Sequence, residues 1–176
     1  MIPLLDNFVK DYEELKTSLL EHSQVSFKNF VEPHLTKTFL FSCASYYEGQ
    51  IQTMIENFMR NITNDERLIS FAINKGVKRQ YHTYFDWDGN NGNPPKNVNS
   101  FLGLFGEEFK RKISIEIKES DTNTENMMAF LTIGNLRNKM AHNNYLEYSL
   151  PKTFDEIIVL YKKANFFLTF LQDKFI

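Results

Sequence analysis

Residues 33–60 read PHLTKTFLFSCASYYEGQIQTMIENFMR, and their apolar side chains recur at helical spacing. The apolar positions step by three and four residues, as one face of an α-helix requires: Leu40, Ala44, Tyr47, Ile51, Met54 and Phe58. With about 1.5 Å of rise per residue, a helix from Pro33 to Arg60 would run roughly 40 Å. We therefore expect one long helix that acts as the spine of the domain.

Helical signals continue on both sides of this spine. A first helix is expected after Pro3, where one apolar stripe contains Leu5, Phe8, Tyr12, Leu15 and Leu19. Three Thr-x-x-Glu sequences predict further helix starts, because the threonine can accept from a free backbone N–H while the glutamate reaches back: Thr63 to Glu66, Thr122 to Glu125 and Thr153 to Glu156. The first of these helices should end near Gly76. Residues 113–117, ISIEI, also alternate like a strand, so their state is ambiguous.

A cluster of turn formers, DGNNGNPP at residues 88–95, predicts a long loop over about residues 80–99. The aromatic residues before it are expected to anchor the loop on the core, with stacking on nucleic-acid bases as the alternative: Tyr81, Tyr84, Phe85 and Trp87. The sequence therefore predicts a single all-α domain over residues 1–176. Its architecture would be a bundle of about four principal helices with shorter helices and one long loop.

The composition excludes several classes of protein. Among 176 residues, 42% are hydrophobic, with 17 Phe and 8 Tyr, so the chain is not disordered. Twenty basic and 22 acidic residues give a net charge of −2, so a polyanion would have to be met by a local patch. The single cysteine, Cys43, excludes an internal disulfide and a cysteine-based zinc site, and is expected to pack. Without a basic leader region or a long apolar run, we expect a cytoplasmic protein with no membrane partner.

One short stretch could carry chemistry: residues 136–142, LRNKMAH, near the end of a predicted helix. Asn138 and His142 lie four residues apart, so the amide could fix the imidazole tautomer that acid–base catalysis requires. Arg137 lies five residues before His142, about 140° around the helix, so the two would not readily converge on one small group. Two such helices packed about a two-fold axis would bring an Arg and a His from each chain together. The alternative is a solvated helix end, with His142 near the C-terminal dipole.

Other catalytic motifs lack support in this sequence. Its four histidines, His22, His34, His82 and His142, show no recognised metal-ligand spacing. The sequence also contains no H-E-x-x-H, Walker loop, G-x-G-x-x-G or G-x-S-x-G motif. We therefore expect neither a catalytic metal nor another cofactor.

The stretch at residues 136–142 resembles the signature of the HEPN superfamily, R-polar-x3-H, in its L-R-N-x-x-A-H form. Residues 45–49, SYYEG, resemble an aromatic-Glu-Gly segment of several prokaryotic subgroups. The segment from Trp87 to Asn99, followed by FLGLFG at residues 101–106, is similar to the RiboL-PSP and MAE-type subgroups. The resemblance spans most of the chain and implies a HEPN-like helical bundle.

The resemblance implies a metal-independent endoribonuclease that acts as a homodimer. His142 would be the general acid/base while a ribose 2′-OH attacks the adjacent phosphate, and Arg137 would hold the phosphate oxygens. Asn138 would orient His142 or the phosphate. Glu48 would orient Arg137, with an ordinary exposed helix glutamate as the alternative. The products would be 2′,3′-cyclic phosphate and 5′-OH ends, and DNA would not be cut.

An RNA substrate requires contacts to phosphates. The sequence contains two basic clusters. One lies at residues 75–79 and includes Lys78 and Arg79, and the other is residues 110–112. Lys139 lies within the motif at residues 136–142. These residues could follow the backbone of a single strand, with an ordinary solvated surface as the alternative.

The family context implies a toxin or an anti-phage defence effector, with an antitoxin or a defence-system protein as partner. HEPN toxins paired with nucleotidyltransferase antitoxins can carry a modified tyrosine two residues after the histidine, where this chain has Asn144. Regulation by that route is therefore not expected. The family also contains inactive members, so the rival hypothesis is a non-catalytic helical module that binds nucleic acid or a partner protein.

Overall fold

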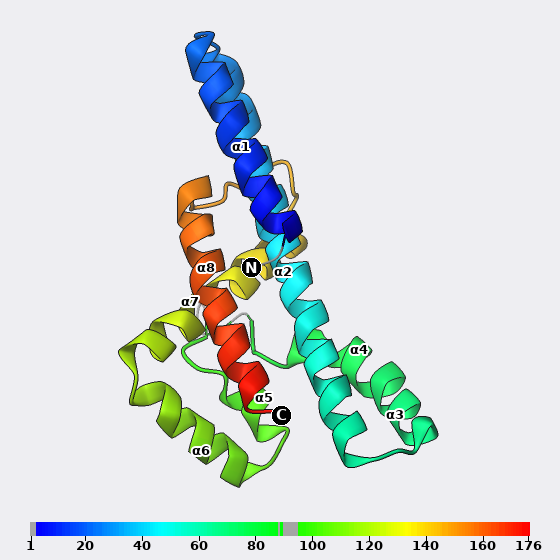
Figure 1. Ribbon diagram of the computed structural model, residues 1–176. Helices are drawn as coiled ribbons and strands as arrows, with labels where there is room; N and C mark the ends of the chain where they lie inside the picture. The colour runs from blue at the N-terminus through cyan, green and yellow to red at the C-terminus, as the bar shows by residue number, and fades with distance from the viewer. Residues whose placement is uncertain (1–2, 88, 90–94) are drawn as a thin grey trace.

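The computed structural model describes residues 3–87, 89 and 95–176. These residues form helices and no strand, which confirms the predicted all-α fold class (Figure 1). The long helices are α1 (Pro3–Glu21), α2 (Val25–Ile62), α7 (Asp121–His142) and α8 (Phe154–Asp173). The shorter ones are α3 (Glu66–Ala72), α4 (Lys78–Gln80), α5 (Asn99–Gly103) and α6 (Glu107–Lys118), and α4 is flanked by a π-helical turn η1 (Ile73–Val77) and a 3-10 turn η2 (Tyr81–Thr83). None of the described helices is long and apolar enough to cross a membrane.

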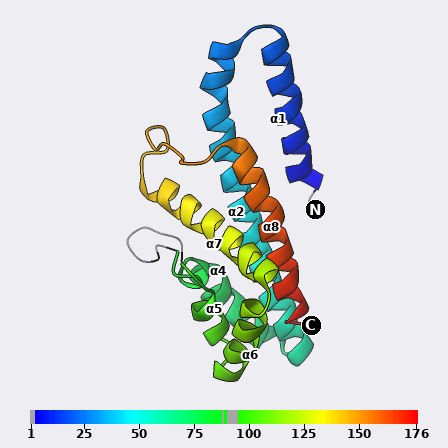
Figure 2. The same ribbon diagram turned by 90° about the vertical axis from the view of Figure 1, so that its left-hand side faces the viewer.

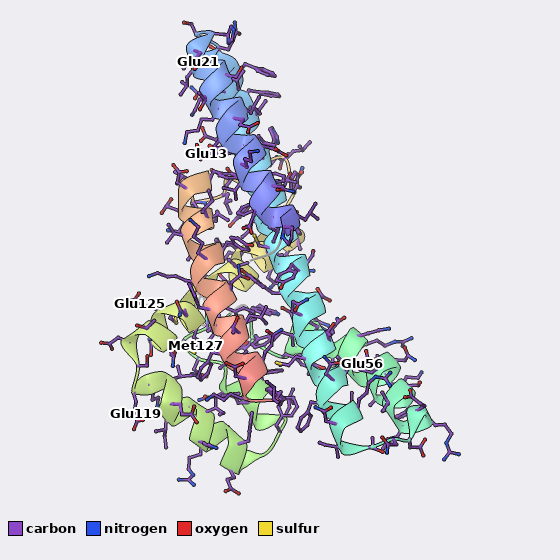
Figure 3. The ribbon with its side chains drawn as sticks, in the orientation of Figure 1. Glu13, Glu21, Glu56, Glu119, Glu125 and Met127 are labelled. Carbon is purple, nitrogen blue, oxygen red and sulfur yellow. The ribbon has the colours of Figure 1, made fainter. Side chains whose placement is uncertain are left out.

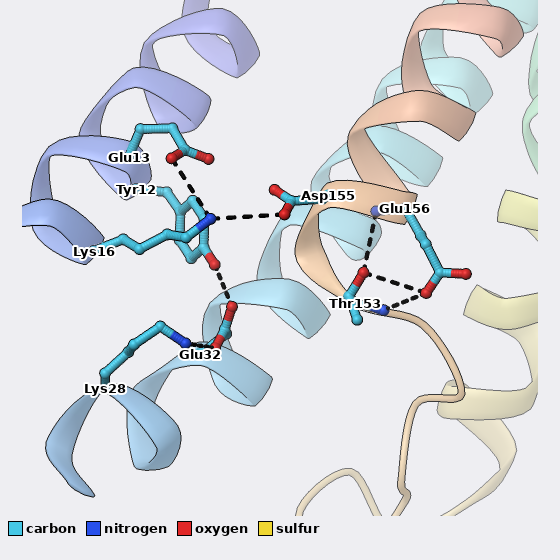
Figure 4. A network of polar contacts seen from close by, with 8 residues as sticks. All are labelled: Tyr12, Glu13, Lys16, Lys28, Glu32, Thr153, Asp155 and Glu156. Carbon is cyan, nitrogen blue, oxygen red and sulfur yellow. Dashed lines mark hydrogen bonds and ion pairs between the residues drawn. The ribbon is translucent and has the colours of Figure 1, made fainter. Parts of the chain in front are cut away.

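Helix α1 and the first part of α2 form an antiparallel pair that projects from the rest of the domain as an arm (Figures 1 and 2). Glu21 lies at the tip of the arm, whereas Glu56 lies near the other end of α2 (Figure 3). The ring of Tyr12 stacks on Phe154 at the start of α8, with centroids 3.6 Å apart. The Tyr12 hydroxyl also donates to Glu32, and burial together with this carboxylate raises the pKa of Tyr12 (Figure 4). Both apolar and polar contacts therefore hold the arm.

Helix α2 begins at Val25, so the predicted start at Pro33 was wrong. Pro33 lies inside the helix, where it has no N–H to donate to the carbonyl of Asn29. The turns on either side are kept helical by the packing of α1 along α2 and by a 2.7 Å bond from the Thr36 hydroxyl to the Glu32 carbonyl. Tertiary packing thus overrides the helix-breaking tendency of proline.

The core lies between α2, α7 and α8. Tyr47 of α2 is buried there, and its hydroxyl donates to the Tyr161 carbonyl of α8 at 3.0 Å. Phe130 of α7 packs against both Tyr47 and Phe167, with ring centroids 5.6 and 5.5 Å apart. The stripe predicted on α2 faces this core: Leu40, Ala44, Tyr47, Ile51 and Met54 are buried, and Phe58 packs at its edge.

One of the three predicted capping boxes forms as expected. Thr153 accepts from the Glu156 N–H, and the Glu156 carboxylate accepts from the Thr153 N–H at 2.9 Å, so both halves of the box are present (Figure 4). The other two predictions were wrong about the capping residue. Asp65 caps α3 by accepting from Arg67, and Ser120 caps α7 by accepting from Asn123. In both cases the N-cap is a neighbouring residue, Asp65 instead of Thr63 and Ser120 instead of Thr122, and its side chain accepts from the free N–H group.

The short helix that starts at Glu66 does not stop near Gly76 as expected. It passes from α3 into the π-helical turn η1 and then into α4. The ambiguous residues 113–117 are helical and belong to α6. Ile113 and Ile117, four residues apart, are buried, whereas Ile115 between them is 43% exposed, which is the burial pattern of a helix rather than of a strand.

The aromatic residues of the predicted loop lie in the core, as the anchoring hypothesis predicted: Tyr81, Tyr84, Phe85 and Trp87. Phe85 stacks on Phe101 with centroids 4.8 Å apart, and Trp87 packs 6.0 Å from the Phe130 ring. The proposed loop limits of about 80 and 99 need adjustment, since Tyr81 begins a 3-10 turn and Asn99 begins α5. Of the turn formers at residues 88–95, residues 88 and 90–94 lie outside the described residues.

Candidate functional site

The predicted catalytic motif occupies the last turns of α7. Its buried stripe contains Ala129, Ile133, Leu136 and Met140, as the sequence predicted. This stripe places Arg137 and Asn138 at the boundary between core and solvent, where both are half-buried. His142 is the last residue of α7 and is exposed. The helix therefore presents its polar residues at one end, beside the core rather than inside it.

Glu48 of α2 lies next to Arg137, as the resemblance implied. Its Oε2 is 4.0 Å from Arg137 Nη2, and the two side chains are 32% and 35% exposed. Gln52, one turn further along α2, donates to the other carboxylate oxygen of Glu48 at 3.3 Å. A guanidinium carries five N–H donors, so one long contact leaves most of them available to a ligand. Glu48 can thus set the direction of Arg137 without occupying its fork.

Arg137 and Glu48 close a narrow cavity of about 10 Å³, which is room for a single water molecule. Its walls are aromatic and aliphatic and come from α2, from α7 and from residues 81–87, which we call the aromatic segment. The wall residues are Ala44, Tyr47, Tyr81, Trp87, Phe130, Ile133 and Gly134. Burial raises the pKa of the Tyr81 hydroxyl; the carboxylate of Glu48 raises it further, while Arg137 opposes the shift. Tyr81 is therefore a neutral wall residue beneath the ion pair.

On its other side, Arg137 lines an open hollow of about 560 Å³, which we call the site hollow. Its lining comes from η2 with the residues that follow it and from the end of α7: His82, Thr83, Asp86, Trp87, Arg137, Asn138, Ala141 and His142. Three of the four predicted catalytic residues thus share one hollow, and the fourth, Glu48, contacts it through Arg137. Arg137 and His142 of one helix therefore both line this hollow, although they lie about 140° apart around the helix axis.

Trp87 fixes the aromatic segment against α7. A Cβ atom at Gly134 would lie only 2.0 Å from the Trp87 ring, so the indole occupies space that only glycine leaves open. The buried amide of Asn135 donates to the Trp87 carbonyl at 2.6 Å. Asp86, just before the indole, has φ +47°, in the left-handed region. These contacts set the position of η2, and with it one wall of the site hollow.

Sequence reasoning did not identify His82, Asp86, Gly134 or Asn135 as site residues. A glycine inside an otherwise helical pattern was the available signal for Gly134, because such a glycine marks a close approach of another group. Nothing in local spacing links His82 to the motif, since tertiary packing, including that of Trp87 on α7, brings the two to one hollow.

The three predicted RNA-binding residues lie near the site hollow but do not line it. Lys139 is half-buried on α7, between Asn138 and the buried Met140. Lys78 and Arg79 are exposed on α4, directly before the turn that carries His82. The other basic cluster lies on α6 among acidic residues, and Lys110 pairs there with Glu107 at 3.2 Å; the alternative reading of an ordinary solvated surface fits that cluster.

Two other candidate chemistries can be placed. Cys43 is fully buried in α2, and burial raises the pKa of its thiol, so it is a core residue as predicted. Among the described residues, no group of three or more His, Cys, Asp or Glu side chains is arranged to hold a metal ion. The polar side chains that line the site hollow carry one guanidinium, two imidazoles, one carboxylate, one amide, one hydroxyl and one indole N–H.

Comparison with known proteins gives one result. The sequence model of the RiboL-PSP-HEPN family matches residues 6–176, which is nearly the whole chain. No curated protein and no solved structure gives a significant match. The match includes the arm, the aromatic segment and the residues of the site hollow.

Proposed function

Because this chain belongs to the RiboL-PSP-HEPN family, we propose that it is a metal-independent endoribonuclease. A HEPN-type domain is an RNase-type or nucleotide-binding module. The observation that supports ribonuclease activity is the site hollow. Arg137, Asn138 and His142 line it, and Glu48 lies 4.0 Å from the Arg137 guanidinium. These groups supply an anion clamp and a proton-transfer group, which are what RNA cleavage by its own 2′-OH requires.

Arg137 would hold the scissile phosphate. Its guanidinium is planar and forked, so it can donate two parallel bonds to non-bridging phosphate oxygens and offset the charge that builds up on them. The pair with Glu48 is a single contact at 4.0 Å, and at this partly exposed position it stabilises the fold little. Its proposed role is to aim the guanidinium toward the hollow.

His142 would move protons. At the exposed end of α7 its imidazole can reach a bound strand, and Asn138 lies one turn before it on the same wall. The 2′-oxygen attacks the adjacent phosphorus, the bond from phosphorus to the 5′-oxygen breaks, and the products carry a 2′,3′-cyclic phosphate and a 5′-OH. DNA lacks the attacking hydroxyl and would not be cut.

We propose a homodimer as the active form, with the α7 ends of two copies close together. One hollow of the described chain contains a single Arg, and a second copy would add another cation to a doubly charged transition state.

The exposed Lys78 and Arg79, with Lys139, would extend the contact along the RNA backbone. The proposed setting is a toxin or an anti-phage defence effector controlled by a partner protein.

The test is an RNA cleavage assay in EDTA with single-stranded RNA and transfer RNA as substrates. Wild type, His142→Ala and Arg137→Ala are compared, with His22→Ala as a matched control, because His22 lies on the arm and contacts the Ser18 carbonyl. We expect cyclic phosphate ends from wild type and from the control only. Folded wild-type protein that binds RNA or a partner but never cleaves would instead support the non-catalytic module.

A further inference from the structure

Cleavage by the 2′-OH needs two proton transfers. One proton leaves the attacking hydroxyl, and another is added to the departing 5′-oxygen. A single imidazole can do both only in sequence, whereas two imidazoles in opposite protonation states can do both in one step. The motif on α7 supplies one histidine per chain, so in the proposed dimer the second proton-transfer group is either His142 of the other copy or another residue that lines the same hollow as His142.

The site hollow contains a second histidine of the same chain. His82 lies on η2 and lines the hollow together with Arg137, Asn138 and His142. Within the described part of the chain, the His82 side chain makes no hydrogen bond or ion pair, and it is exposed. It therefore has both ring nitrogens available to a substrate.

The other two histidines are placed differently. His22 directly follows α1, and its Nδ1 is 2.8 Å from the Ser18 carbonyl. His34 lies on α2 and packs against the Phe30 ring with centroids 5.5 Å apart. Neither lines the site hollow, so the pairing of His82 with His142 is specific to this surface.

The backbone around His82 is held in place. Tyr81 is buried, the Thr83 hydroxyl donates to the Gln80 carbonyl at 2.8 Å, and the Tyr84 N–H donates to the Tyr81 carbonyl at 3.1 Å. Trp87, which follows, is fixed on α7 through Gly134 and Asn135. The backbone of His82 therefore has a defined position, which a catalytic group requires.

We propose that His82 is a second catalytic residue, which donates a proton to the 5′-oxygen while His142 accepts the proton of the 2′-OH. This inference rests on the proposed ribonuclease function. As the 2′-oxygen bonds to phosphorus and the 5′-oxygen leaves, one proton moves to His142 and one leaves His82; exchange with water then restores both. The other charged groups that line the hollow are Arg137 from α7, the proposed phosphate clamp, and Asp86, from the segment after η2.

The first experiment measures kcat/KM against pH for wild type, His82→Ala and His34→Ala, together with RNA affinity and circular dichroism. We expect a bell-shaped profile for wild type and for His34→Ala. His82→Ala should lose about 10²- to 10⁴-fold in rate and the high-pH limb of the bell, with its fold and RNA affinity unchanged. A rate within about threefold of wild type would overturn the inference, as would a slower enzyme that keeps both limbs.

The second experiment removes the need for an acid. A uridine 3′-phosphodiester with p-nitrophenol as the leaving group needs no proton on departure, so His82→Ala should regain most of the lost rate, whereas His142→Ala should not. An equal loss on both substrates would show a structural role and overturn the assignment. If wild type cleaves RNA and His82→Ala matches it, only this inference fails; if wild type never cleaves, the proposed function fails with it.

Discussion

Two of the hollows on this molecule are similar in size and in the residue types that line them, yet they differ in how their charges are paired. The arm hollow, of about 480 Å³, lies between α2 and residues 146–154 and contains Glu32, His34, Lys37 and Lys152. Lys37 is 4% exposed, and its amine donates to the Tyr145 carbonyl at 2.7 Å. Lys152 pairs with Glu156 at 2.7 Å.

The site hollow has the opposite character. Arg137 makes one contact of 4.0 Å, and the side chains of His82 and His142 make no hydrogen bond or ion pair with other described residues. Polar groups bonded within the chain stabilise its fold, whereas those without such bonds remain available for a substrate. The difference supports a structural role for Lys37 and Lys152 in the arm hollow and the proposed catalytic role for Arg137 and His142 in the site hollow, and each of the following substitutions tests it.

The largest effect is expected for Arg137→Ala. If Arg137 is the proposed phosphate clamp, its loss should lower kcat by about 10²- to 10³-fold, because a donor to the transition-state charge is removed. The midpoint of urea unfolding should stay close to that of wild type, since the Glu48 contact is long and partly exposed. A strongly destabilised variant would place Arg137 among the structural residues instead.

Gly134→Ala should be the most damaging small change in the fold. The added methyl would meet the Trp87 ring, and displacing that ring should cost about 1–3 kcal/mol in the free energy of unfolding and also reduce cleavage. Gly49→Ala is the matched control, because a Cβ there meets nothing within 4 Å and should stabilise the helix by about 0.5–1 kcal/mol. Urea unfolding of both variants measures the contrast, and equal stabilities would refute the proposed anchor.

Lys37→Met should lower the stability of the fold and leave catalysis unchanged, which is the opposite of the result expected for Arg137→Ala. The variant keeps the apolar stem but leaves the Tyr145 carbonyl without its donor, which should cost about 1–3 kcal/mol. Cleavage per folded molecule should be unchanged. Activity normalised to the folded fraction checks this, and a specific loss of turnover would show that the arm hollow takes part in function.

The smallest effect concerns the start of α8 at low pH. The amine of Lys152 and the Thr153 N–H lower the pKa of Glu156 to about 2. Because the folded-state pKa lies below the ordinary value of 4.5, the stabilisation is present above pH 4.5 and is lost as pH falls toward 2. An NMR titration should follow Glu156 over that window, and Glu156→Gln should abolish the corresponding fraying of α8. Titration of Glu156 near 4.5 would contradict the predicted cap.

The sequence predicted best the features that depend on local spacing. The stripes on α2 and α7 lie in the core, and the capping box at Thr153 forms because both of its halves lie within one turn. It predicted less well where several local choices compete, as at Thr63, where Asp65 lies nearer to the free N–H groups. The start of α2 was missed because contacts with α1, distant in sequence, hold the turns around Pro33.

The candidate site shows the same division. Spacing paired Asn138 with His142, and the family resemblance gave roles to Arg137 and to Glu48, which lies 4.0 Å from the Arg137 guanidinium. The catalytic roles of these four residues stay predictions. His82 could not be identified in this way, because its place opposite α7 depends on a buried indole and on the space left by a glycine.

The buried thiol of Cys43 has a practical consequence. It is the single cysteine of the chain, it is fully buried, and it lies on α2 one turn before Tyr47. A thiol reagent can therefore modify the native protein only when the core around α2 opens. The rate of Cys43 labelling therefore measures how often the core opens. Slower labelling in the presence of RNA or a partner protein would show that binding stabilises the core, and no engineered probe is needed.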